Sequence, residues 1–141
     1  MQFIIKRDVL LKSLNFVQGV VEKKNTLPIL SNVLLQAQNN KLTIIATDLD
    51  IIFHEKISEV KILKEGSSTT SAAILYDILR KISPNSDLNF DLKSENKLSL
   101  KSDNSNFNLL CLPIDNFPTF PDEFESSEIT LNNSKFLKLL N

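Results

Sequence analysis

Residues 32–50 read NVLLQAQNNKLTIIATDLD, and this stretch is the most informative about the architecture. Two runs rich in aliphatic side chains, 32–38 and 41–47, flank the pair Asn39-Asn40. Asparagine tolerates the positive φ angles of a tight two-residue turn. The stretch therefore predicts a β-hairpin, and residues 50–58 are expected to continue the same sheet.

Upstream of the hairpin, a strand is predicted at residues 2–6 and a helix at 7–21. At about 100° per residue, the apolar side chains of this helix form two stripes, which indicates two packing partners. The first stripe contains Leu10, Leu14, Val17 and Val21, and the second contains Val9, Phe16 and Val20. Lys12 lies on the remaining polar strip and is expected to face outward.

Downstream, a short strand at residues 68–70 precedes a second helix predicted over 72–82. Ser71 is a favourable N-cap for this helix, and Pro84 ends it. The spacing separates a core stripe from a second apolar stripe and leaves Tyr76 and Arg80 outward. The core stripe contains Leu75, Leu79 and Ile82, and the second contains Ile74 and Ile78.

Three alternating segments follow, at residues 87–93, 97–102 and 105–112, separated by Glu95-Asn96 and Asp103-Asn104. Alternation of apolar and polar side chains is typical of half-buried antiparallel strands. The predicted fold class is α+β, with two helices packed on one face of an antiparallel sheet.

Composition excludes several classes of function. The 141 residues contain one cysteine, one histidine and two glycines, which leaves no internal disulfide, no Cys/His zinc set and no glycine-rich phosphate loop. No apolar run approaches the roughly 20 residues of a membrane span, and the start lacks a signal-peptide pattern. We therefore expect a cytoplasmic protein without metal or cofactor, in which Cys111 is a small core residue and His54 lies on a sheet face.

Charge is unevenly distributed, although the net charge is −1. Residues 1–24 carry five basic and two acidic side chains, a balance of +3, whereas residues 115–128 carry five acids and no base. The acidic stretch also holds Pro118 and Pro121 and is interpreted as leading into a linker.

The segment after the linker repeats the start of the chain at an offset of 126 residues. Four aligned pairs are identical: Leu11/Leu137, Lys12/Lys138, Leu14/Leu140 and Asn15/Asn141. A chance match of two generic strand-then-helix segments is one interpretation. The other is that residues 128–141 begin a second copy of the same domain.

Asp48 and Asp50 are the only paired carboxylates that suggest chemistry. They have the spacing to hold Mg²⁺ or to act as an acid/base pair, but acids two residues apart at a strand end more often accept hydrogen bonds in a bend. We therefore expect a bend.

Specific motifs indicate a family. TLPILSNVLL at residues 26–35, LT at 42–43 and ATDLD at 46–50 occur in order, and LPIDNFP at 112–118 closes the segment. Together they resemble the amino-terminal domain of the bacterial DNA polymerase III beta subunit, the replicative sliding clamp. The resemblance covers essentially the whole chain.

The resemblance implies a DNA-clamp domain at residues 1–122, a linker at 123–127 and the truncated start of a second clamp domain at 128–141. Family members have three such domains, and two subunits close head to tail into a ring around duplex DNA. It implies a non-catalytic processivity factor without cofactor. Its partners would be duplex DNA, a second subunit, and DNA polymerase III and the clamp loader, which bind domains absent here.

Site residues follow from the same resemblance. Lys24, just before the TLPIL motif, matches a DNA-contact position of the family, and Lys12 and Arg80 suit a DNA-facing role. Ala73 and Ile74 stand where relatives can carry basic residues, which weakens the case for the second helix. The apolar contact with the other subunit would use Ile74, Ile78 and Phe107, although Phe107 also fits a core position.

Two other classes remain open from the residues alone. A stand-alone α+β adaptor or small-ligand-binding domain would explain the fold but not the offset repeat. An enzyme using Asp48 and Asp50 would need a basic or metal-binding partner that the sequence does not indicate. Continuation of the reading frame into further clamp domains distinguishes the clamp from the adaptor.

Overall fold

A computed structural model of the chain describes residues 1–21 and 27–118. In chain order the elements are β1 (Gln2–Lys6), α1 (Arg7–Val17), η1 (Pro28–Ser31), β2 (Asn32–Gln38), β3 (Lys41–Thr47), β4 (Ile52–Ile57), β5 (Val60–Lys64), β6 (Gly66–Ser71), α2 (Ala72–Lys81), β7 (Asp87–Ser94), β8 (Lys97–Ser102), β9 (Ser105–Leu110) and η2 (Ile114–Asn116). The linker and the second copy predicted at 123–141 lie outside the described residues.

The central hairpin has the predicted form. Strands β2 and β3 pair antiparallel up to Gln38 and Lys41, and Asn39 and Asn40 between them have φ angles of 53° and 61°. Two successive positive φ angles define the turn whose twist matches that of paired strands. The two asparagines therefore set the register of the hairpin.

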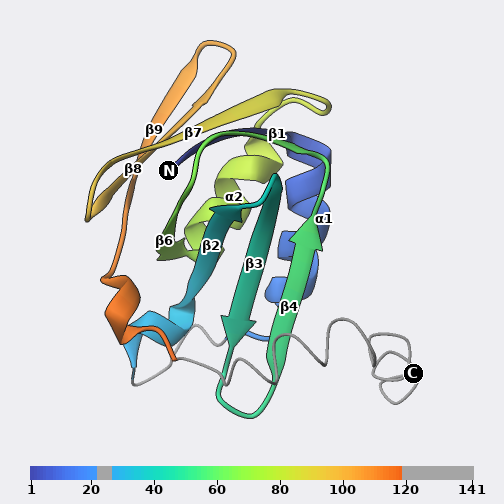
Figure 1. Cartoon of the computed structure of the whole chain (residues 1–141). Helices are drawn as coiled ribbons and strands as arrows, with labels where there is room; N and C mark the ends of the chain where they lie inside the picture. The colour runs from blue at the N-terminus through green and yellow to red at the C-terminus, as the bar shows by residue number, and fades with distance from the viewer. Residues whose placement is uncertain (22–26, 119–141) are drawn as a thin grey trace.

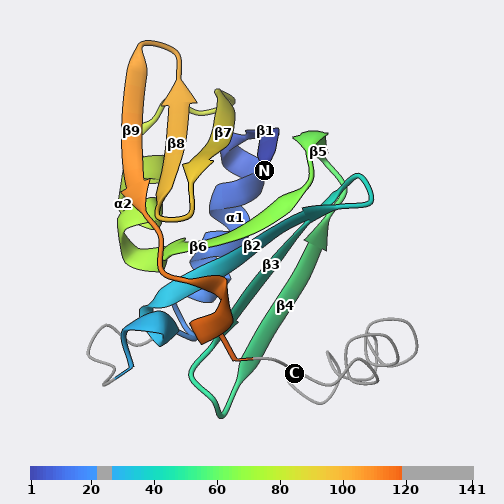
Figure 2. The same cartoon turned by 60° about the vertical axis from the view of Figure 1, so that its left-hand side comes forward.

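The strands form two antiparallel sheets, whereas the sequence pattern predicts a single sheet with both helices on one face. The five-stranded sheet has the order β5-β1-β7-β8-β9, and the four-stranded sheet has the order β4-β3-β2-β6. The chain changes sheet after β4, where Ser58 and Glu59 separate it from β5, a strand the sequence analysis did not assign. Figure 2 shows β6 passing between the two groups of strands.

Threonine side chains join the two sheets at their neighbouring edges. The Thr69 hydroxyl of β6 donates to the carbonyl oxygen of Leu112 at 2.8 Å, and the Thr70 hydroxyl donates to that of Leu110 at 3.1 Å. These bonds replace a backbone ladder between β6 and β9. The two sheets are thereby linked although they do not merge.

The helices pack side by side and antiparallel, behind β2, β3 and β6 in Figures 1 and 2. Gln18 Nε2 donates to the carbonyl oxygen of Ala72 at 3.3 Å, and Arg7 Nε donates to that of Leu79 at 2.9 Å. Each bond joins the start of one helix to the end of the other. Helix α1 ends at Val17, four residues earlier than predicted, and α2 ends at Lys81.

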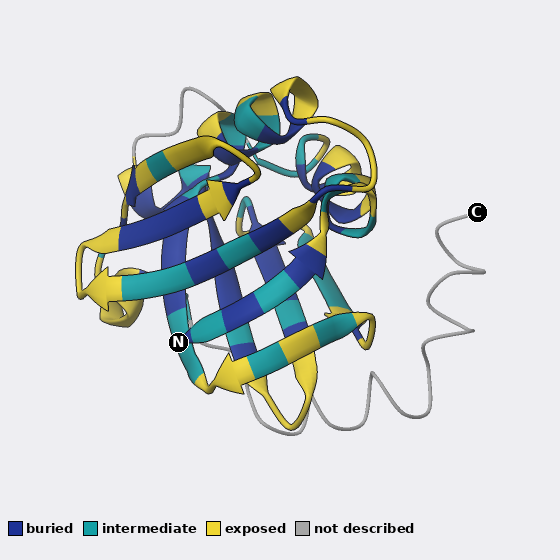
Figure 3. Ribbon diagram, turned by 90° about the horizontal axis from the view of Figure 1, so that it is seen from above, coloured by how far each residue is buried: buried dark blue, intermediate teal, exposed yellow. Residues whose placement is uncertain are grey.

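One main core lies between the helices and the inner faces of both sheets. Buried residues alternate with less buried ones along β1 and the first half of β7, as Figure 3 shows, whereas β2 has four consecutive buried residues. Phe3 and Phe90 stack at its centre, with ring centroids 4.8 Å apart. A smaller cluster on the outer face of the four-stranded sheet consists of Ile29, Leu30, Leu34, Ile45 and Phe117.

Candidate nucleic-acid interface

Helix α1 buries its first apolar stripe and presents Lys12 on its polar strip. Leu10, Leu14 and Val17 are fully buried, whereas Lys12 is exposed. None of the ion pairs between described residues includes Lys12. The ammonium group is therefore available to an anion, as the helical periodicity predicted.

Helix α2 begins at the predicted cap and presents Arg80 near its end. The backbone N–H of Ile74 donates to the Ser71 hydroxyl oxygen at 3.2 Å, and Leu75 and Leu79 point into the core. The Arg80 side chain is 61% exposed, with its guanidinium 4.0 Å from Asp77 and 5.4 Å from the centre of the Tyr76 ring. Asp77 compensates part of the charge, so Arg80 presents a weaker positive potential than Lys12.

Because α1 and α2 pack antiparallel, Lys12 and Arg80 lie on adjacent helices. The Arg7 bond to Leu79 places the end of α2, with Arg80, beside the start of α1. At about 1.5 Å per residue, Lys12 lies roughly 7.5 Å further along α1 than Arg7. Each helix carries two basic residues and one acid, a balance of +1.

Arg7 and Asp8, at the start of α1, are committed to structure. Arg7 bonds both Leu79 and the Asp8 carboxylate, at 3.0 Å, and Asp8 also accepts from the backbone N–H of Asn85. The Arg7 guanidinium, followed by the Asn85 amide, holds the pKa of Asp8 below its ordinary value. The Arg7–Asp8 pair therefore fixes the start of α1.

Lys24, the third predicted DNA contact, lies outside the described residues.

The residues predicted for subunit contact differ in exposure. Ile74 is 55% exposed on α2, whereas Ile78 and Phe107 are half-buried and pack against the main core. Phe107 lies opposite Leu100 on the inner face of the sheet, so its side chain contributes to the packing of the main core. Leu110, which no pattern in the sequence singles out, is 83% exposed on the outer face of the edge strand β9.

Comparison with known proteins identifies the family. The chain matches the family described as "DNA polymerase III beta subunit, N-terminal domain" over residues 1–121. The chain belongs to this family. The curated beta sliding clamp of Caulobacter vibrioides is 37% identical over 142 residues, covering 99% of this chain and 38% of that protein. The curated beta sliding clamp of Vibrio harveyi is 33% identical and is covered over 96% of its length.

Solved structures of the same family have a similar fold. The structure titled "Caulobacter crescentus pol III beta" has 38% sequence identity and a TM-score of 0.81, covering 87% of this chain and 33% of that chain. The DNA polymerase III subunit beta from Pseudomonas aeruginosa has 35% identity and a TM-score of 0.80. These likenesses confirm the α+β clamp-domain fold with two helices on antiparallel sheets. The chain spans about 38% of the Caulobacter relative's length.

In this clamp domain the Asp48 segment is a bend, as expected. Asp48 Oδ1 accepts the backbone N–H groups of Ile51 at 2.7 Å and Asp50 at 2.9 Å, and these bonds hold the pKa of Asp48 below its ordinary value. Leu49 between the two acids has a φ of 82°. Among the described residues, no group of three or more His, Cys, Asp or Glu side chains is placed to hold a metal ion.

The remaining titratable candidates of the clamp domain occupy structural positions. Cys111 is 6% exposed in the main core, and burial raises the pKa of its thiol. His54 lies opposite Ile45 on the outer face of the four-stranded sheet, as predicted. The longest described helix, α1, has 11 residues, and no described helix has the length and apolar character of a bilayer span.

Proposed function

We propose that this chain is the first domain of a DNA sliding clamp, a non-catalytic subunit that encircles duplex DNA in the cytoplasm and tethers the replicative polymerase. Membership of the beta-subunit N-terminal domain family carries this proposal, and favours the clamp over a stand-alone adaptor. The domain occupies residues 1–122, residues 123–127 are the linker, and residues 128–141 begin the second domain.

The two helices form the DNA-facing surface in this proposal. Lys12, Arg80 and Lys24 supply sequence-independent attraction to phosphates. A ring retains DNA by enclosure, so its inner surface needs only weak attraction that permits sliding. The balance of +1 on each helix and the Asp77–Arg80 pair at 4.0 Å suit this requirement better than a strongly basic groove would.

The ring is completed by a second subunit. The side of the domain formed by α2 and the edge strand β9 provides this contact, through Ile74, Ile78 and Phe107. Exposed Leu110 on the same edge strand adds apolar surface. DNA polymerase III and the clamp loader bind regions of the full-length subunit beyond this chain.

The test uses the full-length clamp and its loading onto circular primed DNA. Lys12→Glu, Lys24→Glu and Arg80→Glu should each reduce loading or retention, because each replaces an attraction to phosphate by a repulsion. Lys61→Glu, on the exposed side of β5, is the matched control and should load normally. Removing one phosphate contact should also lower the slope of log K against log salt by about 0.9.

Melting temperatures separate binding from folding in this test. Surface charge changes away from packed groups usually alter stability by less than about 0.5 kcal/mol. Normal loading with a given lysine or arginine reversed would remove that residue from the site. A large fall in melting temperature would show that its role is structural.

A further inference from the structure

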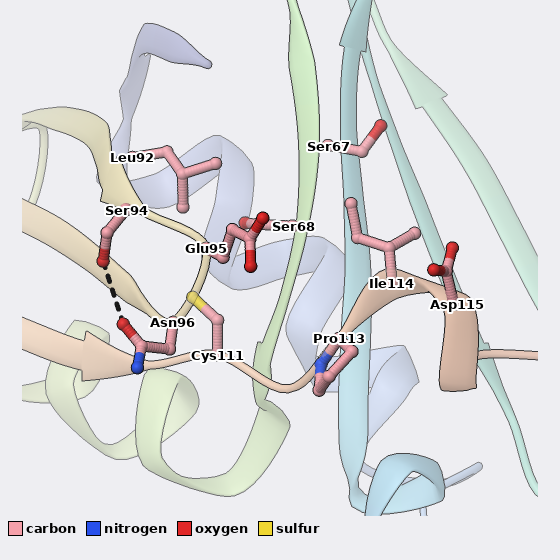
Figure 4. A pocket seen from close by; sticks show the side chains of 10 residues that line it. All are labelled: Ser67, Ser68, Leu92, Ser94, Glu95, Asn96, Cys111, Pro113, Ile114 and Asp115. Atoms are coloured by element: carbon pink, nitrogen blue, oxygen red, sulfur yellow. Dashed lines mark hydrogen bonds between the residues drawn. The ribbon is translucent and has the colours of Figure 1, made fainter.

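An open pocket of about 680 Å³ lies where the two sheets meet. Its walls come from the start of β6, the turn between β7 and β8, and the segment that leads from β9 into η2 (Figure 4). None of the lining residues belongs to α1 or α2. The pocket is therefore separate from the proposed DNA-facing surface, and its volume falls in the range of about 300–1,000 Å³ typical of small-molecule sites.

The charge of the lining is acidic. Glu95, in the β7–β8 turn, and Asp115, in η2, contribute carboxylates, and none of the described residues that line the pocket is Lys, Arg or His. Both carboxylates are exposed, and neither belongs to an ion pair between described residues. Two unpaired carboxylates at one opening attract a cation and repel an anion.

A buried hydroxyl in the wall lacks a partner. Ser68 is 2% exposed and lines the pocket, and its Oγ lacks a geometrically formed hydrogen bond within residues 1–21 and 27–118. The Cys111 thiol, a weak hydrogen-bonding group, is its polar neighbour, since an interaction with Ser68 opposes the burial that raises the pKa of this thiol. Because buried polar groups are nearly always hydrogen-bonded, a hydroxyl with only a weak thiol beside it has capacity for a further polar partner.

The rest of the lining combines aliphatic side chains with small polar ones. Leu92, Pro113 and Ile114 contribute aliphatic surface, and the Ser94 hydroxyl donates to Asn96 Oδ1 at 2.9 Å. A ligand that matches this lining has an apolar body and a positively charged N–H donor. We propose that the pocket binds a small organic cation, a protonated amine on a compact apolar body. This inference is independent of the proposed clamp function.

The test compares three probes that share one ring and differ in charge: benzylammonium, benzyl alcohol and benzoate. Each is titrated into the 141-residue chain, uniformly labelled with ¹⁵N, while amide shifts are followed by NMR. Benzylammonium should give saturable shifts at residues 67–68, 92–96 and 111–115, benzyl alcohol weaker ones, and benzoate none. Equal responses to the three probes, or shifts centred elsewhere, would overturn the proposal.

Variants then assign the recognition to named groups. Glu95→Gln combined with Asp115→Asn should weaken benzylammonium binding about two- to tenfold, towards the level of benzyl alcohol. Glu59→Gln combined with Asp103→Asn changes two exposed acids outside the pocket and should leave binding unchanged. Ser68→Ala should weaken benzylammonium about two- to tenfold. Unchanged affinity in the pocket variants, with amide spectra that remain folded, would contradict the proposal.

Discussion

Thr69 holds the two sheets together through a single oxygen. Its hydroxyl donates to the carbonyl oxygen of Leu112 and accepts both the Leu112 backbone N–H, at 3.2 Å, and Asn32 Nδ2, at 3.2 Å. The residue is fully buried. Every partner of this oxygen is consequently a polar group that loses a hydrogen bond if the hydroxyl is removed.

Thr69→Val should therefore destabilise the domain although it preserves shape. Valine leaves a partly buried carbonyl and two donors without this partner, and we expect a loss of about 1–3 kcal/mol in the free energy of unfolding. Thr43→Val, on β3 with a half-buried side chain, is the control and should stay within about 0.5 kcal/mol of wild type. Urea unfolding measures the free energy of unfolding of both variants. Equal losses would show that the Thr69 hydroxyl makes no particular contribution to joining the two sheets.

His54 makes stability depend on pH. Burial, followed by the positive charge of Lys56, holds the pKa of His54 below its ordinary value of 6.5. As the pH falls below 6.5, the unfolded chain takes up this proton before the folded chain does, so stability decreases until the folded pKa is passed. His54→Gln should remove this decrease.

The only imidazole of the chain allows a direct measurement. Its proton resonances should titrate with a midpoint below 6.5 in the folded protein. Urea unfolding above and below that pH should show a smaller pH effect in His54→Gln than in wild type. A folded-state midpoint above 6.5 would reverse the sign and contradict the prediction.

The two helices start in different ways. Helix α2 has a side-chain cap, because Ser71 Oγ accepts the Ile74 backbone N–H at 3.2 Å. Helix α1 has no side-chain cap at Lys6; instead the Arg7 backbone N–H donates to the carbonyl oxygen of Ser86 at 2.8 Å. The start of α1 thus depends on the segment after α2, whereas the start of α2 is local.

Ser71→Ala should cost about 1 kcal/mol of stability, because an N-terminal amide of α2 loses its acceptor. Ser71→Asp should retain the cap and add a favourable charge at the helix N-terminus, so its unfolding free energy should stay close to wild type. Chemical denaturation compares the two. A similar loss in both variants would mean that Ser71 acts through its strand pairing with Asn32 instead.

Elements set by neighbouring residues were predictable, and pairings between distant residues were not. Asn39-Asn40, Ser71 and the helical spacing act within a few positions, so the hairpin and both helices were placed closely. The division into two sheets depends on β1 pairing with β5 and β7, about 60 and 90 residues away. No local pattern in residues 60–64 reveals that partnership.

The candidate site shows the same limit. Exposure of Lys12 and Arg80 follows from helical periodicity, which assigns one face per helix. Which side chains of β9 face the core and which face solvent depends on the register of β9 against β8. This register puts Phe107 opposite buried Leu100 and Leu110 opposite exposed Lys97. Alternation alone leaves the two faces of an edge strand interchangeable, which is why Leu110 was missed.

At the scale of the whole molecule, the three proposed surfaces of the domain consist of different residues. The helices carry exposed Lys12 and Arg80, the α2–β9 side carries exposed Ile74 and Leu110, and the acidic pocket lies between the sheets. The proposed DNA contact and subunit contact share helix α2 but use different residues of it, Arg80 for DNA and Ile74 with Ile78 for the second subunit, whereas the pocket has no lining residue on either helix. A change at one surface is expected to leave the others intact.

This separation predicts the oligomeric state of the 141-residue chain. In the proposed ring the α2–β9 side meets a different domain of the other subunit, so two copies of this side have no reason to complement each other. Ile78 and Phe107 are already packed against their own core, which leaves little free apolar area beyond Ile74 and Leu110. A stable interface buries at least about 1,200 Å² in total.

The chain should therefore be a monomer of 16.0 kDa by light scattering at micromolar concentration. In the full-length clamp, Ile74→Glu should promote dissociation of the dimer because it places a charge in the proposed apolar contact. In the 141-residue chain, the same change should hardly alter the melting temperature, since Ile74 is 55% exposed. Leu63→Glu, at 48% exposure on the opposite edge strand β5, is the matched control and should leave the dimer intact. A stable dimer of the 141-residue chain, or a full-length dimer indifferent to Ile74→Glu, would contradict the proposed contact, because either result would mean that association does not depend on this side meeting a different domain.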